Sequence, residues 1–187
     1  MRVALITIPR SGSSFYSRVL AKQYKVKHVG ELFTEAKQPS IDDSLRIWSH
    51  GNCCAKIFTR DFIHMPRARE SLEYYENLVY GTADKIVYLY RKNKIDHLKS
   101  MITADTTSNW APYREYKEHI IDVTKDKMFE QLRRIELDIT RLDQVRNRFP
   151  GEVIYYEDFA TEDKKYKYKS TFICEGKELP EDLGLNL

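Results

Sequence analysis

Apolar runs of strand length alternate with segments of helical spacing along this chain, and that alternation limits its possible folds more than any other feature. The run 2–8 is rich in Val, Ile and Leu with little polar alternation, which is typical of a strand buried on both faces. Further strands are predicted over 25–29, 53–58, 85–90 and 152–156. Strands joined through helices form right-handed crossovers, so the sequence predicts an α/β fold, a three-layer parallel sheet with helices on both faces.

The helical segments carry recognisable faces and caps. Helices are predicted over 13–24, 41–49, 67–79, 93–104, 112–121 and 124–149. In the first of them, Phe15, Val19 and Leu20 share one apolar face. Ser40 and Thr124 precede their helices at the position where a hydroxyl caps free backbone N–H groups.

The rest of the chain is predicted to be loop or edge structure within one domain. The polar segment 105–109 is predicted to be a loop, and the polar tail 160–187 to contribute an edge strand over 167–174. The 187 residues contain no internal repeat and no linker rich in Pro, Gly or Ser. The sequence therefore predicts a single domain over 1–187.

Composition excludes several classes of protein. A net charge of +3 argues against a dedicated nucleic-acid binder, and no apolar run has the length of a membrane span or of a signal peptide. The three cysteines are odd in number and lack the spacing of a zinc site, so buried reduced thiols are expected. We therefore expect a cytoplasmic protein without nucleic-acid or membrane partners.

The loop after the first strand carries the strongest functional signal. It reads Pro9, Arg10, Ser11, Gly12, Ser13 and Ser14. Gly12 allows a tight turn, and the backbone N–H groups that open the next helix favour an anion. The serine hydroxyls and the Arg10 cation would add to a cradle for phosphate or sulfate. The alternative is an ordinary strand–helix turn in which Ser13 is the helix cap.

This loop lacks the Gly-Lys-Ser/Thr ending of a Walker A motif, but it resembles the 5′-phosphosulfate loop of the sulfotransferases that use 3′-phosphoadenosine 5′-phosphosulfate (PAPS). The form with Arg after Pro is similar to the trehalose-sulfotransferase-like and other prokaryotic branches. The resemblance implies a P-loop-NTPase-like fold and PAPS as the sulfuryl donor, with no metal required. It also implies that Pro9–Ser14 bind the donor and that Arg10 stabilises the leaving phosphate oxygen.

Two further segments support the resemblance. In this family, basic residues at a strand end and a helical serine hold the 3′-phosphate of the donor, which implies that role for Arg91, Lys92 and Ser100. Lys92 lies eight residues before Ser100, the common family spacing, and Arg91 lies nine before it. Tyr156, in the sequence Tyr-Glu-Asp, resembles a tyrosine near the donor's adenine. The alternatives are a solvated basic helix start over 91–99 and a core aromatic at 156.

Sulfuryl transfer to a hydroxyl group needs a general base. Glu31 follows the second predicted strand and resembles the base of the trehalose-type branch, so it is the first choice. Glu35 and His50 are the reserves. The alternative role for Glu31 is a structural carboxylate paired with Arg10.

The function predicted from these residues is transfer of a sulfuryl group from PAPS to a hydroxyl or amine of a small molecule or carbohydrate. One alternative is an ATP-dependent, kinase-like enzyme, because Glu157 and Asp158 after an apolar strand imitate the end of a Walker B motif. Another is an inactive relative that binds PAP, the desulfated donor, or phosphate without turnover.

Overall fold

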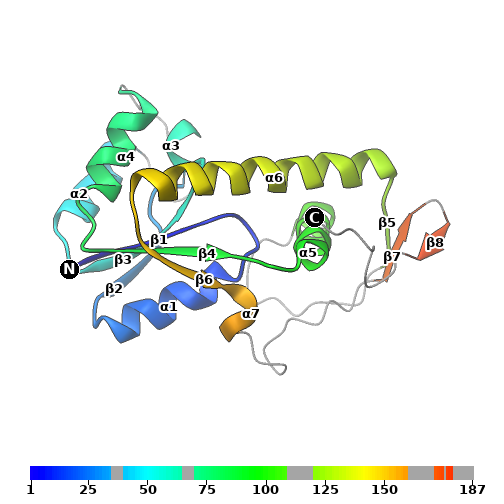
Figure 1. Ribbon diagram of the computed structural model, residues 1–187, viewed down its shortest axis with the longest axis horizontal. Helices are drawn as coiled ribbons and strands as arrows, with labels where there is room; N and C mark the ends of the chain where they lie inside the picture. The colour runs from blue at the N-terminus through cyan, green and yellow to red at the C-terminus, as the bar shows by residue number, and fades with distance from the viewer. Residues whose placement is uncertain (35–39, 65–69, 109–119, 160–170, 175, 179–187) are drawn as a thin grey trace. The chain divides into compact units, whose positions relative to one another are not determined.

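Figure 1 shows the protein as a computed structural model. The structure describes residues 1–34, 40–64, 70–108, 120–159, 171–174 and 176–178. The chain divides into two compact units: the first holds Met1–Tyr90 and Asp138–Tyr155, and the second holds Arg91–Leu137 and Tyr156–Leu187. The single domain expected over 1–187 stays a prediction, and each unit is described by itself.

The first unit is built on a five-stranded parallel sheet, which confirms the α/β class and the parallel sheet. Its strands are β1 (Arg2–Thr7), β2 (Lys27–Glu31), β3 (Cys53–Phe58), β4 (Lys85–Tyr90) and β6 (Glu152–Tyr155), in the order β2-β3-β1-β4-β6. β1 lies at the centre, and Val3, Ala4, Leu5 and Ile6 have no exposed surface. The apolar run at the start of the chain is therefore a central strand with both faces covered, as its composition predicts.

Pairing brings the carboxyl ends of three strands to one level. Thr7 of β1 pairs with Phe58 of β3 and with Leu89 of β4. In the sheet, β3 lies on one side of β1 and β4 lies on the other, so the strand order reverses at β1. In open α/β sheets, ligands bind at the carboxyl edge where the strand order reverses in this way.

The helix α1 (Ser13–Gln23) lies against one face of the sheet (Figure 1). The apolar face predicted for this helix is not the face that is buried. Phe15 and Val19 are each 38% exposed. The buried stripe is instead formed by small side chains, Ser13, Ser17 and Ala21, together with Leu20. Small residues let the helix lie close to the sheet, where the Cys54 thiol donates a hydrogen bond to the Ser17 carbonyl at 3.4 Å.

The other helices of this unit contribute to the main core cluster. They are α2 (Ile41–Ser49), α3 (Asp61–His64), α4 (Leu72–Tyr80) and the last part of α6 (Lys125–Arg148). Trp48, Val79 and Leu142 pack in this cluster with the strand residues Ile6 and Ile57. Both predicted caps are confirmed. The Ser40 hydroxyl accepts from the Asp43 N–H at 3.2 Å, and the Thr124 hydroxyl accepts from the Lys127 N–H at 3.3 Å.

The second unit contains α5 (Lys94–Thr107), the first half of α6, α7 (Tyr156–Phe159) and a small sheet. The sheet has the order β5-β7-β8, from β5 (Ile120–Asp122), β7 (Thr171–Cys174) and β8 (Lys177–Glu178). β7 is therefore the middle strand rather than an edge strand. Among the described residues, no helix combines the length and the apolar character needed to cross a membrane.

Several predicted boundaries are wrong in this part of the chain. Residues 105–107 continue α5 instead of forming a loop, and Ile120–Ile121 belong to β5 instead of ending a helix. The rest of the helix predicted over 112–121 lies outside the described residues. In the first unit, Ser71 caps α4, which begins at Leu72, and residues 67–69 of the helix predicted over 67–79 lie outside the described residues.

Candidate functional site

The loop between β1 and α1 has the backbone that an anion site requires. Gly12 is the N-cap of α1 and lies at φ +82°, in the left-handed region that favours glycine. Gly12, not Ser13, is therefore the cap residue. Its carbonyl accepts from the N–H groups of Phe15 and Tyr16 at 3.1 and 3.3 Å. The N–H groups of Ser13 and Ser14, which precede these two, have no acceptor within the helix, so this end of the helix attracts negative charge.

The hydroxyl of Ser11 faces inward and shapes the loop. Ser11 has no exposed surface, and its Oγ donates to the Ile8 carbonyl at 2.8 Å. Thr7 Oγ1 lies 2.6 Å from Ser11 Oγ and donates to the Leu89 carbonyl at 3.0 Å. This chain of contacts ties the loop to the ends of β1 and β4. A donor-binding role for Ser11 would therefore use its backbone N–H.

Arg10 adopts a conformation that few non-glycine residues take. Its φ of +61° lies in the left-handed region, between Pro9 and Ser11 in the tight turn that precedes Gly12. Positive φ at both Arg10 and Gly12 is the kind of curved backbone that presents successive N–H groups to an anion. Arg10 is thus part of the turn itself, and the role of this loop as an anion cradle stays a prediction.

Lys56 is a site residue that the sequence analysis missed. It lies on β3 with a side chain 6% exposed, and its Nζ donates to Ser14 Oγ at 2.8 Å. The same Nζ lies 2.5 Å from Glu31 Oε1 and 5.1 Å from the centroid of the Phe58 ring. A buried cation requires such partners. The signal was present in the sequence, as a lone charge inside the apolar run 53–58.

Glu31 forms an ion pair, but its partner differs from the one expected. It is the last residue of β2, opposite Lys56 in the register of β2 with β3, and its side chain is 27% exposed. The ion pair is with Lys56, whereas the sequence predicted Arg10 as the structural partner. One carboxylate and one ammonium group therefore lie beside the first turn of α1.

Asp61 is a second carboxylate near this pair and was also missed. Its Oδ2 accepts from the Phe58 N–H at 2.8 Å, and its Oδ1 accepts from the Thr34 hydroxyl at 3.4 Å. Only 7% of Asp61 is exposed. Burial, with the nearby charge of Glu31, raises the pKa of Asp61 to about 7, although both hydrogen bonds and Lys56 act against this shift. Asp61 therefore titrates near neutral pH.

This pKa predicts a measurable pH dependence of stability. An aspartate exposed to solvent has an ordinary pKa of 3.8, so between about pH 4 and pH 7 the folded protein holds a proton at Asp61 that the unfolded chain has released. The unfolding free energy should therefore fall as the pH rises through this window, by roughly 4 kcal/mol at most, and then level off. Asp61→Asn should remove this decline, because the amide stays neutral and can still accept from the Phe58 N–H.

Denaturant unfolding at pH 5 and pH 8 measures the effect. Asp84→Asn is the matched control, because the Asp84 carboxylate accepts from the Arg2 N–H in an exposed position, and it should keep the wild-type pH dependence. An equal decline in wild type and Asp61→Asn would show that Asp61 does not carry it.

The reserve bases have different positions. Glu35 lies outside the described residues. His50 follows α2 and precedes β3, so it lies at the amino edge of the sheet, and its Nδ1 lies 2.5 Å from the Arg46 carbonyl. A strand of this length spans about 20 Å, which separates His50 from the carboxyl edge.

The residues predicted to hold the 3′-phosphate lie in the second unit. Arg91 directly follows β4 in the chain, its side chain is 7% exposed, and its guanidinium lies 4.8 Å from the centroid of the Tyr156 ring. One Nη of Arg91 lies 3.7 Å from Asp96 Oδ2. Lys92 is half exposed and forms a 2.6 Å ion pair with Asp158. Arg91 is thus the more firmly packed of the two cations.

Tyr156 and Ser100 are also buried in this unit. Tyr156 opens α7 instead of ending a strand, and its ring packs edge-on against Phe159 as well as under Arg91. Ser100 is 2% exposed on α5. The structure thus groups Arg91 with Tyr156 in one unit and the loop 9–14 with Glu31 in the other. The ligand roles of these residues remain predictions.

Glu157 binds the backbone at the start of α5. Its carboxylate accepts from the N–H groups of Lys92 and Asn93 at 2.9 and 3.0 Å, at the start of α5. Asp158 is held by Lys92. Both acidic residues that imitate a Walker B motif are therefore engaged with the segment that follows β4.

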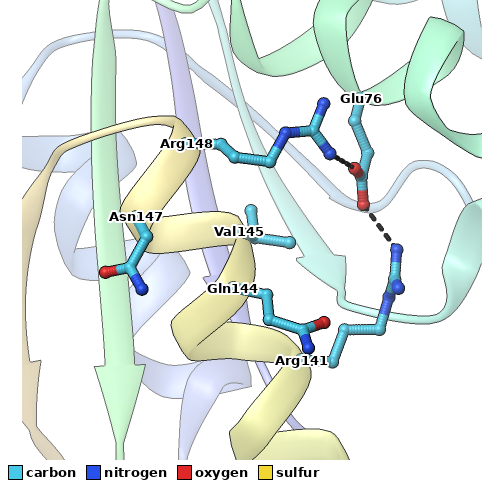
Figure 2. A pocket seen from close by; sticks show the side chains of 6 residues that line it. All are labelled: Glu76, Arg141, Gln144, Val145, Asn147 and Arg148. Atoms are coloured by element: carbon cyan, nitrogen blue, oxygen red, sulfur yellow. Dashed lines mark hydrogen bonds and ion pairs between the residues drawn. The ribbon is translucent and has the colours of Figure 1, made fainter.

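A surface pocket in the first unit is lined by other residues (Figure 2). They are Glu76, Arg141, Gln144, Val145, Asn147 and Arg148. Glu76 has a side chain only 2% exposed and accepts from Arg141 and Arg148, each at 2.7 Å. Arg141 also donates to the Thr59 carbonyl at 3.0 Å. This network neutralises a buried carboxylate between α4 and α6, and it contains none of the predicted site residues.

Comparison of the chain with protein-family models and with curated proteins finds no match in either set. The functional assignment therefore depends on the residues and their geometry.

Proposed function

We propose that this protein transfers a sulfuryl group from PAPS to a hydroxyl or amine of a small molecule or carbohydrate. The observation that carries the proposal is the contact of the Lys56–Glu31 ion pair with Ser14 of the loop 9–14, whose sequence resembles a 5′-phosphosulfate loop. We also propose that the fold is the three-layer, P-loop-NTPase-like arrangement. The parallel strand order around a central β1 supports this.

The chemistry needs positive charge on one side of sulfur and a base on the other. The acceptor oxygen bonds to sulfur as the bond from sulfur to the 5′-phosphate oxygen breaks, and PAP leaves with the electron pair. By analogy with phosphoryl transfer, positioning and electrostatic stabilisation supply most of the rate. Arg10, Lys56 and the N–H groups of α1 are the donors for the charge that develops on the leaving oxygen. Glu31 receives the acceptor's proton.

The ion pair between Lys56 and Glu31 fits both tasks. A donor anion at the start of α1 would compete with Glu31 for Lys56, because Nζ already lies 2.8 Å from a side chain of the first turn. Drawing Lys56 toward the donor would release Glu31 to accept a proton. The pair is thus a means of keeping the base in place until the donor binds.

Calorimetry with PAP in the absence of metal, and separately with ATP plus magnesium, tests the proposal. Tight PAP binding without metal, followed by turnover of PAPS with an acceptor panel, is the expected result. Preference for ATP with a requirement for magnesium would instead support a kinase-like enzyme. PAP binding without sulfuryl transfer to any acceptor would support a non-catalytic binding protein.

The 3′-phosphate assignment makes a separate prediction. PAP should bind at least tenfold more tightly than adenosine 5′-phosphate, which lacks only the 3′-phosphate, because a charge-assisted contact contributes about 1.5–3 kcal/mol. Arg91→Ala and Ser100→Ala should reduce this ratio. Lys94→Ala is the matched control and should keep it, because Lys94 is paired with Glu136 and is not one of the predicted donor-binding residues. Using the affinity ratio corrects for any general loss of stability when the Arg91–Tyr156 contact is removed. Equal affinities in wild type would reject the assignment.

A further inference from the structure

Three charged side chains converge at the carboxyl edge of β2 and β3, and one cation serves two carboxylates. Lys56 Nζ lies 2.5 Å from Glu31 Oε1, and both groups act electrostatically on Asp61. The Thr34 hydroxyl, three residues after Glu31, donates to Asp61 at 3.4 Å and links the segment after β2 to the turn after β3. With all three groups ionised, this cluster carries a net charge of −1.

Among the described residues around Asp61, few other groups offset the negative charge of its ionised form. The charged groups that act on it are Glu31 from β2 and Lys56 from β3. From α4 it faces Tyr80, a buried phenol whose own pKa is raised by burial and by nearby acidic groups. From α6, Arg141 is held by Glu76 and by the Thr59 carbonyl. Arg60, the residue before Asp61, pairs with Asp138 at 3.4 Å.

An anion at the loop 9–14 would favour the protonated form of Asp61 for two reasons. Its own negative charge would disfavour ionised Asp61. The anion would also attract Lys56, whose ammonium lies 2.8 Å from Ser14 at the start of α1. The positive charge of Lys56 would then stabilise the ionised form of Asp61 less. Both effects favour the protonated carboxyl, so the sign of the coupling does not depend on the exact pose of the anion.

We propose that the Asp61 carboxylate takes up a proton from the solvent when an anion binds at the loop 9–14. The uptake converts the carboxylate to a carboxylic acid and adds one positive charge to the cluster, which partly offsets the charge of the anion. Anion affinity therefore decreases as the pH rises above neutrality. This inference relies on the anion site of the proposed function and adds its regulation by pH.

Calorimetric titration with PAP at pH 7.5, in buffers of different ionisation enthalpy, counts the protons taken up on binding. PAP itself changes protonation on binding, so the informative quantity is the difference between wild type and Asp61→Asn. If the anion raises the pKa of Asp61 from about 7 to about 8, wild type takes up about half a proton more than the variant. At pH 5 this difference should vanish, because Asp61 is already protonated.

Each outcome decides between the two proposals. Equal proton counts in wild type and Asp61→Asn, with PAP bound to both, would overturn proton uptake by Asp61 and leave the proposed function standing. Loss of the extra uptake in Glu31→Gln alone would assign the proton to Glu31 and reject Asp61. Failure of wild type to bind PAP would reject the proposed function and this inference together.

A measurement on wild type keeps the inference testable if Asp61→Asn does not fold. Carboxyl carbons of aspartate labelled with ¹³C report protonation by NMR. One buried aspartate should titrate near pH 7 without PAP and at higher pH with PAP. An unchanged titration curve on addition of PAP would contradict proton uptake at Asp61.

Discussion

Arg10→Ala is expected to weaken PAP binding by about 10- to 150-fold and to abolish sulfuryl transfer while leaving the fold intact. The reason is the loss of the cation in the turn that precedes α1. A donor aimed at developing charge contributes about 10²–10³ to the rate in other enzymes, so the transfer rate should fall more than the affinity. Arg10 has φ +61°, which alanine tolerates no better, so the substitution removes the guanidinium without relieving the backbone.

Calorimetry, thermal unfolding and single-turnover transfer measured together test this expectation. Arg46→Ala is the matched control, because Arg46 is an exposed arginine on α2 that pairs with Asp43. Arg10→Lys should recover part of the affinity through its charge, but less of the rate, since an ammonium lacks the planar fork of a guanidinium. Wild-type affinity and turnover in a well-folded Arg10→Ala protein would remove Arg10 from the site.

The sheet was largely predictable because its strands are buried on both faces. The strands over 53–58 and 85–90 have the predicted bounds. Apolar runs of this length that are rich in β-branched and aromatic residues are typical of strands inside a parallel sheet. The loop 9–14 was equally predictable from the sequence, because Gly12 marks the turn and the following serines begin a helix.

The inward face of α1 could not be predicted from hydrophobicity. Its buried stripe consists of Leu20 and the small residues Ser13, Ser17 and Ala21, while Phe15 and Val19 are partly exposed. A helix that must lie close to the sheet selects small residues for contact, so size overrides apolar character. The pattern that predicts an inward face assumes that burial follows hydrophobicity alone.

The partners of Lys56 and Asp61 could not be predicted from the sequence for a different reason. Each lies beside residues distant in the chain, and their pairing with Glu31 or Thr34 depends on the register of β2 with β3. The sequence marks Lys56 as an isolated charge in a buried strand, but it does not identify the partner. The sequence therefore indicates the loop 9–14 and Glu31 as parts of a candidate site. It does not place Lys56 between them, because that position depends on the pairing of β2 with β3.

The boundary at Tyr156 was missed because the apolar run does not reveal contacts with residues distant in the chain. The apolar run predicts a strand through this residue, but Glu157 binds the N–H groups of Lys92 and Asn93. This contact is compatible with a turn into α7 directly after β6.

Glu31→Gln is expected to lower the single-turnover rate of sulfuryl transfer by about 10²–10⁴, the usual contribution of a positioned acid or base. Glutamine keeps the size of Glu31 and can accept a hydrogen bond from Lys56, but it cannot take the proton of the acceptor. PAP affinity should be kept or tightened, because Lys56 loses the carboxylate that competes with the donor. A slow enzyme with intact donor binding is thus the signature of a base.

A purely structural Glu31 would give a different combination of results, with a lower melting temperature and a transfer rate close to that of wild type. Glu152→Gln is the matched control, since it breaks a 2.8 Å pair between Glu152 and Lys85 at the amino edge of the sheet and should leave transfer unchanged. Full activity in Glu31→Gln would rule out the base role and move attention to Glu35, because His50 lies at the other edge of the sheet. A rate loss accompanied by weaker PAP binding would instead indicate that Glu31 acts by orienting Lys56 toward the donor. Rate, affinity and melting temperature measured on this one variant therefore distinguish a proton acceptor from an ion-pair partner.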